Sequence, residues 1–161
     1  MHDRCPAIQV DAQTGSVRGV LVRTGELADR SQVQAIASQG MREFGLTPDF
    51  NGLDRELGNF GASGGPVFAE LVAEHGGEVV GCLILGRKGP ELLKLTGFYV
   101  DPKGRGQGVG KTLLRAAIEC ACKNSYQGIY LETWGKMVQA VHLYESFGWK
   151  ATGALPPESG A

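Results

Sequence analysis

A glycine-rich stretch in the second half of the chain has the residues expected of an anion-binding loop. The run Arg105-Gly106-Gln107-Gly108-Val109-Gly110 follows an apolar, β-favouring segment that ends at Pro102, and an amphipathic stretch begins at Val109. This order predicts a strand, a tight loop and the N-terminus of a helix. Backbone N–H groups in such a loop, added to the positive end of the helix dipole, can bind a phosphate or diphosphate. Glycine suits the loop because a Cβ would keep the backbone away from the anion.

Spacing separates the classes of protein that use glycine loops of this kind. A Walker A loop, G-x-x-x-x-G-K-S/T, would end at Gly110-Lys111-Thr112, but its first glycine would fall on Arg105. Only about a third of the chain follows, which is too little for the rest of a nucleotidase sheet. The dinucleotide fingerprint G-x-G-x-x-G lacks its third glycine in every frame. The pattern R/Q-x-x-G-x-G/A is the one that fits, with Arg105, Gly108 and Gly110 in place.

A second motif strengthens this interpretation. Residues 140–149 read A-V-H-L-Y-E-S-F-G-W and follow an apolar run that ends at Leu131-Glu132-Thr133. The loop and this segment resemble the two cofactor elements of the GCN5-related N-acetyltransferase (GNAT) family, whose members bind acetyl-coenzyme A (acetyl-CoA). The second element of that family reads A-x-x-L-Y-E-x-x-G-F/W. The resemblance covers roughly Leu95 to Trp149, and the N-terminal half matches only in its general pattern of elements.

The resemblance implies a GNAT fold of the α/β (α+β) class. Such a fold has a central, mostly antiparallel mixed sheet that is splayed into a V between two strands and flanked by helices. Residue patterns independently predict three successive strands, over Pro66–Glu74, Glu78–Leu85 and Glu91–Val100, joined by short turns. Gly97 inside the third strand predicts a bulge. In the family, a bulge there helps to open the V that receives the pantetheine arm.

The remaining elements follow from hydrophobic periodicity and from breakers. We expect strands over Val17–Arg23 and Gln127–Thr133, helices over Leu27–Gly45, Asp54–Leu57, Val109–Lys123 and Lys136–Phe147, and the start of a strand at Trp149–Thr152. Residues 1–15 lack periodicity and are expected to be a flexible segment, which leaves 16–161 as a single acetyltransferase domain. The family fold closes with one more strand, and here the chain stops after the loop Pro156–Gly160. Truncation, a strand from a partner chain and a bare sheet edge are the three explanations.

The resemblance also assigns roles to particular residues. Backbone amides of the loop would hold the diphosphate of acetyl-CoA, and the splayed strand would pair with pantetheine and offer an N–H to the oxyanion. Alternatively, the charged loop residues are ordinary surface charges that do not bind the cofactor, and the strand is an ordinary core strand. The predicted cofactor-binding residues are Phe98, Tyr99, Val100, Arg105, Gly106, Gln107, Gly108, Val109, Gly110 and Lys111.

Two further residues carry the predicted catalytic chemistry. Tyr144 aligns with the tyrosine that serves the family as general acid for the coenzyme A thiolate, although it could equally be a packing residue on an apolar helix stripe. Glu132 aligns with the general base of some relatives, with surface placement as the alternative, and Glu70 and Glu91 are fallback candidates. One position departs from the family. Met137 stands where many relatives have an asparagine that contacts the cofactor.

Composition excludes several classes of function. A formal net charge of −1 over 161 residues gives no basic field for nucleic acid, and no apolar run approaches the ~20 residues of a membrane span. No apolar h-region follows Met1–Arg4, so no secretory signal is expected. The scattered histidines suggest no metal site. The cysteines at positions 5, 82, 120 and 122 form no C-x-x-C pair and are expected to be buried, reduced thiols of a cytoplasmic protein, with a metal site or a disulfide as the alternative.

The sequence therefore predicts an acetyl-CoA-dependent N-acetyltransferase. The acceptor is expected to be a primary amine of a small molecule or of a peptide or protein, acetylated by direct attack in a ternary complex. The alternative is a non-catalytic module that binds coenzyme A or an acyl-CoA, and a P-loop nucleotidase is a distant third. Formation of a homodimer is left open.

Overall fold

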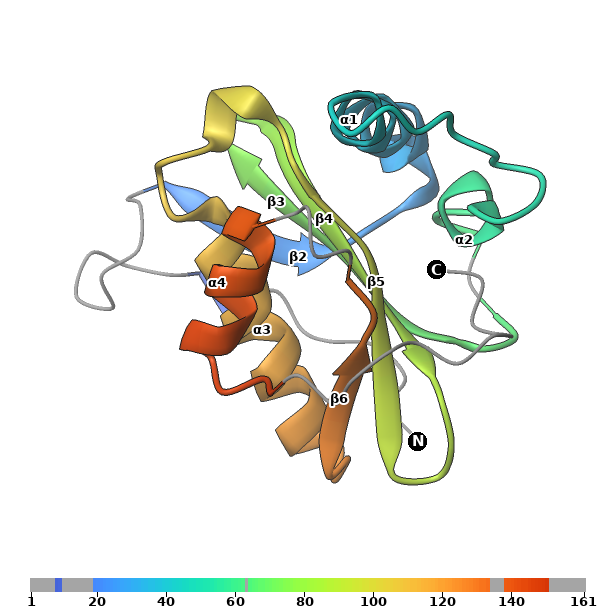
Figure 1. The fold of residues 1–161 in the computed structure, drawn as a ribbon, viewed down its shortest axis with the longest axis vertical. Helices are drawn as coiled ribbons and strands as arrows, with labels where there is room; N and C mark the ends of the chain where they lie inside the picture. Colours follow the sequence, from blue (N-terminus) through green and yellow to red (C-terminus); the bar gives the residue numbers. More distant parts are fainter. Residues whose placement is uncertain (1–7, 10–18, 63, 134–137, 151–161) are drawn as a thin grey trace. The chain divides into compact units, whose positions relative to one another are not determined.

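The computed structural model describes residues 8–9, 19–62, 64–133 and 138–150, which fall into two compact units, Met1–Tyr130 and Leu131–Ala161 (Figure 1). A six-stranded sheet has the order β1-β2-β3-β4-β5-β6. The strands are β1 (Ile8–Gln9), β2 (Val20–Thr24), β3 (Val67–His75), β4 (Glu78–Arg87), β5 (Leu92–Val100) and β6 (Gly128–Leu131). The α-helices are α1 (Arg30–Arg42), α2 (Arg55–Gly58), α3 (Val109–Lys123) and α4 (Val138–Ser146), and two 3-10 turns are η2 (Leu27–Asp29) and η3 (Pro102–Gly104).

Strands β3, β4 and β5 form the predicted antiparallel meander. The turn between β3 and β4 consists of Gly76 and Gly77, with φ of +63° and +83°, and His75 pairs directly with Glu78. Positive φ at both central residues is the geometry of a type I′ turn, whose twist matches that of the flanking strands. Strand β4 is buried along nearly its whole length, because it is the central strand and both of its faces are covered.

Helices cover the two faces of this sheet (Figure 1). On one face, α1 and α2 pack on residues of β3 and β4, including Cys82 and Ile84, in a single apolar cluster. The adjacent residue Gly81 points to the other face, where a Cβ would lie 2.9 Å from Leu113 Cδ1 of α3. The absence of a side chain at Gly81 therefore allows α3 to approach the sheet closely.

The bulge predicted at Gly97 is present in β5. Cys82 pairs with Tyr99 and Ile84 pairs with Thr96, so β5 has one more residue than β4 between the two pairs. Gly97 has φ +56°, which a residue with a side chain rarely adopts. The bulge changes the course of β5 immediately before the residues that were predicted to contact the cofactor.

The largest differences from the sequence prediction are at the first helix and at the chain ends. The predicted helix over Leu27–Gly45 divides into η2 and α1, and Leu27 is 59% exposed. A 3-10 turn has three residues per turn, so Leu27 leaves the face shared by Val33 and Ile36. Trp149 and Lys150 are not in a strand. The rest of that predicted strand, the final loop and most of the N-terminal segment lie outside the described residues, and Ile8–Gln9 pairs with β2.

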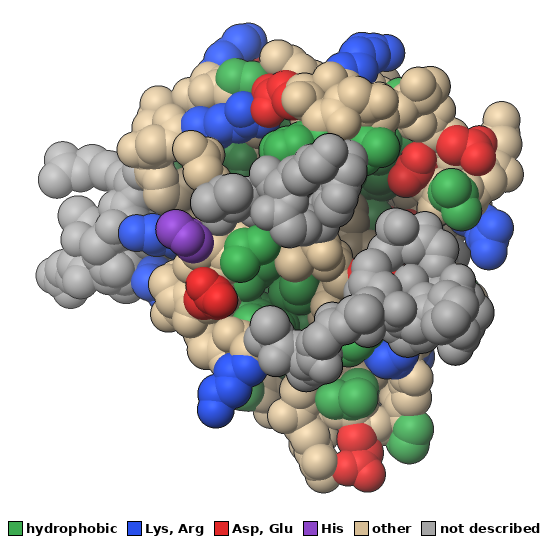
Figure 2. Space-filling view, viewed as in Figure 1, with side chains coloured by type: hydrophobic (Ala, Val, Ile, Leu, Met, Phe, Trp, Pro, Cys, Tyr) green, Lys and Arg blue, Asp and Glu red, His purple; other side chains and the backbone are tan. Residues whose placement is uncertain are grey.

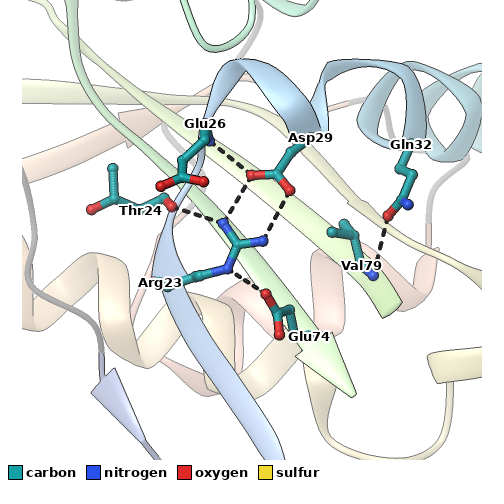
Figure 3. A network of polar contacts seen from close by, with 7 residues as sticks. All are labelled: Arg23, Thr24, Glu26, Asp29, Gln32, Glu74 and Val79. Atoms are coloured by element: carbon teal, nitrogen blue, oxygen red, sulfur yellow. Dashed lines mark hydrogen bonds and ion pairs between the residues drawn. The ribbon is translucent and has the colours of Figure 1, made fainter. Parts of the chain in front are cut away.

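A polar network joins β2, η2 and β3 at the start of α1 (Figure 3). Arg23 donates two hydrogen bonds to the buried carboxylate of Asp29, of 2.8 Å and 2.9 Å, and also forms an ion pair with Glu74. Asp29 accepts a further hydrogen bond from the N–H of Glu26, at 2.8 Å. The hydrogen bonds from Arg23 are the main reason that the pKa of Asp29 is lowered from its usual value near 3.8.

Asp29→Asn is expected to lower the free energy of unfolding at pH 7 by about 1.5–3 kcal/mol, because it removes charged hydrogen bonds from a buried site. A carboxylate with a lowered folded-state pKa stabilises the protein above its unfolded-state pKa, and this contribution disappears as the pH falls through the folded-state pKa. The difference from the unsubstituted protein should therefore shrink below about pH 4. Urea unfolding from pH 3 to 7 measures it, with Glu78→Gln at the exposed turn as the control. A difference in unfolding free energy that is independent of pH would contradict the lowered pKa of Asp29.

Gly97→Ala is expected to destabilise the protein by about 2–4 kcal/mol, through backbone strain and crowding. A Cβ at this position would lie 3.0 Å from Ile84 Cδ1 and 3.2 Å from Leu57 Cδ2. The matched control is Gly77→Ala, where φ is also positive but no heavy atom lies within 4 Å of the added Cβ. That variant should lose only about 1–2 kcal/mol, from the left-handed backbone alone. Equal losses in urea unfolding would show that the bulge is not tightly packed.

Candidate active site

The chain passes from β5 to α3 through a loop that is held closely against β4. The N–H of Asp101 donates to the carbonyl of Val80 at 2.8 Å, and its carboxylate accepts from the N–H of Lys103 at 2.8 Å. Gly104 is buried, and a Cβ there would lie 3.3 Å from Val109 Cγ2 and 3.4 Å from Val80 Cβ. The first part of the loop is therefore rigid, and its course depends on glycine at position 104.

The second part of the loop leaves its backbone donors unused. Gly106 and Gly108 have φ of +77° and +83°, and Gly108 is the N-cap of α3. Within the described part of the chain, the backbone N–H groups of residues 106–111 donate to no acceptor, and the first bonded N–H is that of Thr112, to Gly108 O at 3.0 Å. No heavy atom lies within 4 Å of a Cβ placed on Gly106, so the space beside this backbone is open. Free donors at the N-terminus of a long helix are an anion site.

Side chains of the loop other than that of Lys111 are held away from these donors or are buried. Arg105 forms an ion pair with Glu43 at 3.0 Å, and its backbone N–H already donates to Pro102 O at 3.3 Å. The amide nitrogen of Gln107 donates to Lys103 O at 3.1 Å. Val109 is buried against the sheet, and Lys111 is exposed. An anion at this loop would therefore meet main chain first.

The end of β5 presents one edge to β4, and the N–H of Val100 lies on the other edge. The N–H of Asp101 donates to the carbonyl of Val80 in β4. Because successive N–H groups of a strand point in opposite directions, the N–H of Val100 points away from β4. Strand β6 has four residues, and Gln127 N–H, just before it, donates to Glu91 O at 2.8 Å. At ~3.3 Å per residue, β6 ends before it reaches Phe98, seven residues after Glu91. Val100, at the end of β5, therefore lies beyond the end of β6.

Tyr99 points to the face of the sheet covered by α1 and α2. Its ring packs so closely on α1 that a Cβ at Gly40 would lie 2.6 Å from Tyr99 Cδ1. Burial raises the pKa of the Tyr99 phenol to about 12, and the charge of Asp54 acts in the same direction. Beneath it, the Cys82 thiol donates to Gly97 O at 3.2 Å, and burial raises the pKa of that thiol to about 12. Both groups stay protonated at neutral pH, so neither is a base or a nucleophile.

The two predicted catalytic residues belong to the second compact unit, Leu131–Ala161. Tyr144 of α4 is buried, its ring packs edge-on against Trp149 with 5.8 Å between centroids, and its carbonyl accepts from Trp149 N–H at 3.2 Å. Tyr144 is thus a packing residue within its own unit, and its role as an acid stays a prediction. Glu132 is half-buried just after β6. Met137 lies outside the described residues.

The fallback carboxylates differ in position. Glu70 on β3 is 5% exposed and accepts from Gly61 N–H at 3.0 Å. Glu91 is exposed at the beginning of β5, about 30 Å of strand away from Val100. Of the two, Glu70 is the one that contacts the segment between α2 and β3, through Gly61. The roles of both stay predictions.

Sequence reasoning did not single out Thr96. Its hydroxyl oxygen is buried and has no hydrogen-bond partner among the described residues, and Thr96 lies immediately before the bulge. A threonine in a strand is too common to give a signal, and only the coordinates reveal an unsatisfied hydroxyl there. The cysteine prediction is confirmed at Cys82, which carries a buried free thiol. It is wrong at Cys122, whose free thiol is exposed, and at Cys120, which is disulfide-bonded.

Three predicted absences concern metal, nucleic acid and membrane. In the described ranges, no group of His, Cys, Asp and Glu has the arrangement of a metal site. Among these same residues, no helix has the length and hydropathy needed to cross a membrane. Figure 2 shows that cationic and anionic side chains alternate around the described part of one face, without a continuous basic patch there.

Comparisons with known proteins agree with the fold and the motifs. A family model described as an acetyltransferase (GNAT) domain matches residues 67–151. An uncharacterized N-acetyltransferase of Schizosaccharomyces pombe is 30% identical over 128 residues, which cover 77% of this chain and 78% of that protein. The chain belongs to the GNAT acetyltransferase family, and the predicted fold class is confirmed.

Two solved structures illustrate the family fold. The ribosomal-protein-alanine N-acetyltransferase of Brucella melitensis is 25% identical, with a TM-score of 0.66 over 82% of this chain and 85% of that chain. A predicted acetyltransferase from Clostridium acetobutylicum, solved with acetyl-CoA, is 17% identical, with a TM-score of 0.66 over 85% of this chain and 94% of that chain. The second likeness shows the fold alone.

Gly110→Glu is expected to raise the Kd for coenzyme A by about 10- to 100-fold, because it places a negative charge beside an anion site. The helix should tolerate the change, since an acidic residue in the first turn is favourable and glycine is a poor helix former. Gly110→Gln is the matched neutral control and should weaken binding less. Titration calorimetry and thermal unfolding measure both properties. Unchanged affinity in a folded Gly110→Glu variant would place the anion site elsewhere.

Proposed function

We propose that this protein transfers the acetyl group of acetyl-CoA to a primary amine of a small molecule, peptide or protein. The observation that carries the proposal is the row of unused backbone N–H groups over residues 106–111 at the N-terminus of α3. Acetyl-CoA carries a diphosphate, which is the anion that such a row of donors fits. Membership of the GNAT family and the acetyl-CoA in a protein of the same fold support it.

The proposal gives the described elements distinct tasks. The backbone of the loop, from Gly106 to Lys111, would hold the diphosphate, and the open space beside Gly106 would let it approach. The end of β5, Phe98–Val100, would pair with the amides of pantetheine as an added strand does, with the outward-facing N–H of Val100 as one donor. An N–H on that edge would stabilise the oxyanion that forms when the amine attacks the thioester carbonyl.

Acetyl transfer also requires two proton movements. The amine nitrogen forms a bond to the carbonyl carbon, and the carbon–sulfur bond then breaks to release the coenzyme A thiolate. We assign the proton for this thiolate to the phenol of Tyr144, because a phenol and an alkanethiol have similar pKa values, near ~10 and ~8.5. Glu132 would accept the proton of the amine, directly or through water. The cytoplasmic location and the homodimer stay predictions.

The second candidate is a module that binds coenzyme A or an acyl-CoA without turnover. The observation in its favour is that Tyr144 has a packing role, against Trp149, that would retain it without catalysis. The two functions differ in one measurement, the release of free thiol from acetyl-CoA in the presence of a panel of amines. Tight binding of coenzyme A without thiol release for any amine would favour the module.

Tyr144→Phe is expected to lower kcat by about 100-fold or more, because general acid catalysis contributes that much, and to leave the Kd for acetyl-CoA within a few-fold. Phenylalanine keeps the ring that packs on Trp149. Tyr126→Phe is a matched control, since this tyrosine packs on Phe68, with 5.1 Å between ring centroids, and has no assigned role. Stopped-flow or steady-state thiol release measures both variants. An unchanged kcat in Tyr144→Phe would show that Tyr144 only packs against Trp149 and is not the general acid.

A further inference from the structure

We infer that Arg105 is a positioning residue and not a ligand of the diphosphate. Its side chain fixes the end of β5 and the end of α1 in place beside the loop. This inference rests on the proposed function. It concerns the one charged residue of the R/Q-x-x-G-x-G/A pattern, for which both an ionic contact to the cofactor and plain surface charge are the obvious alternatives.

Arg105 already uses its backbone N–H and two of its three side-chain nitrogens in hydrogen bonds to other parts of the protein. Its backbone N–H donates to Pro102 O at 3.3 Å, unlike those of residues 106–111. Its Nε donates to Val100 O at 3.2 Å, and one of its terminal nitrogens donates to Glu43 Oε1 at 3.0 Å. The guanidinium therefore faces β5 and the end of α1.

The hydrogen bond to Val100 completes the restraint of a single peptide group. The carbonyl of Val100 accepts from Arg105, and the N–H of the same peptide, which belongs to Asp101, donates to Val80 O at 2.8 Å. A peptide group is planar, so these two bonds fix the direction in which the chain leaves β5. This peptide adjoins Phe98–Val100, the edge that the proposed function assigns to pantetheine.

The partner carboxylate argues against an electrostatic role. Glu43 is the C-cap residue of α1, 62 positions away in the chain, and its charge cancels much of the field of Arg105 at the loop. Both side chains are about 40% exposed, at 43% and 38%, so the ion pair contributes little to stability. What the arginine adds is geometry. Glutamine, which the sequence pattern allows at this position, can donate the same hydrogen bond to Val100 without a charge.

The test compares Arg105→Gln, Arg105→Ala and Glu43→Gln. We expect Arg105→Gln to bind coenzyme A within about threefold of the unsubstituted protein, with the same dependence on ionic strength. Arg105→Ala should bind about tenfold more weakly and lose kcat as well, again with an unchanged salt dependence. Glu43→Gln should bind with unchanged affinity. Titration calorimetry at several salt concentrations, steady-state kinetics and thermal unfolding supply these readouts.

Opposite results would overturn the inference. If Arg105 bound the diphosphate, Arg105→Gln and Arg105→Ala would weaken binding equally and with a shallower salt dependence, because a screened charge had been lost. Glu43→Gln would then tighten binding by releasing the guanidinium. Full activity of Arg105→Ala would show that the residue is plain surface charge. If Arg105→Ala does not fold, Arg105→Gln and Glu43→Gln still distinguish a positioning role from binding of the diphosphate. Failure of the unsubstituted protein to bind coenzyme A would instead overturn the proposed function.

Discussion

The unused backbone donors at the start of α3 are the constraint on which the candidate site depends. An N–H group that is buried without an acceptor costs free energy, so such a row can persist only where water or a ligand reaches it. Residues 105–107 are exposed, and Gly108 and Gly110 are half-buried. Water and an anion can therefore reach the donors of Gly106 and Gln107.

A rigid support keeps these donors aligned. Val109 and Leu113 of α3 pack against Gly81, the central strand β4 runs beneath them, and Gly104 presses the loop onto Val80. These contacts are apolar and close, so the helix cannot rotate its first turn without losing buried area. The glycines of the segment consequently have two different functions. Gly104 is required for packing, whereas Gly106 and Gly108 supply positive φ, and Gly106 also leaves open space beside the backbone.

Much of this arrangement could be predicted, because local residue patterns specify it. The α3 boundaries, Val109–Lys123, coincide with the prediction, since a glycine turn begins the helix and its apolar period continues to its end. The meander followed from short glycine turns, and the bulge followed from Gly97 inside an apolar strand. The buried face of α3 follows the apolar period at Val109, Leu113 and Ala117, but the apolar Ile118 is half-buried and the polar Thr112 is buried.

What could not be predicted involves partners that are distant in the chain. Arg105 meets Glu43, Asp29 is buried because Arg23 and the N–H of Glu26 satisfy it, and Thr96 is left without a partner. A single sequence has no periodicity or spacing that records such pairs, because the sheet and helices must first bring the residues together. The residue types, glycine spacing and apolar periods thus determined a strand, an anion-binding turn and a helix in order. Only the tertiary structure decided which of the loop's polar groups stay unpaired, because each group's freedom depends on neighbours that folding supplies.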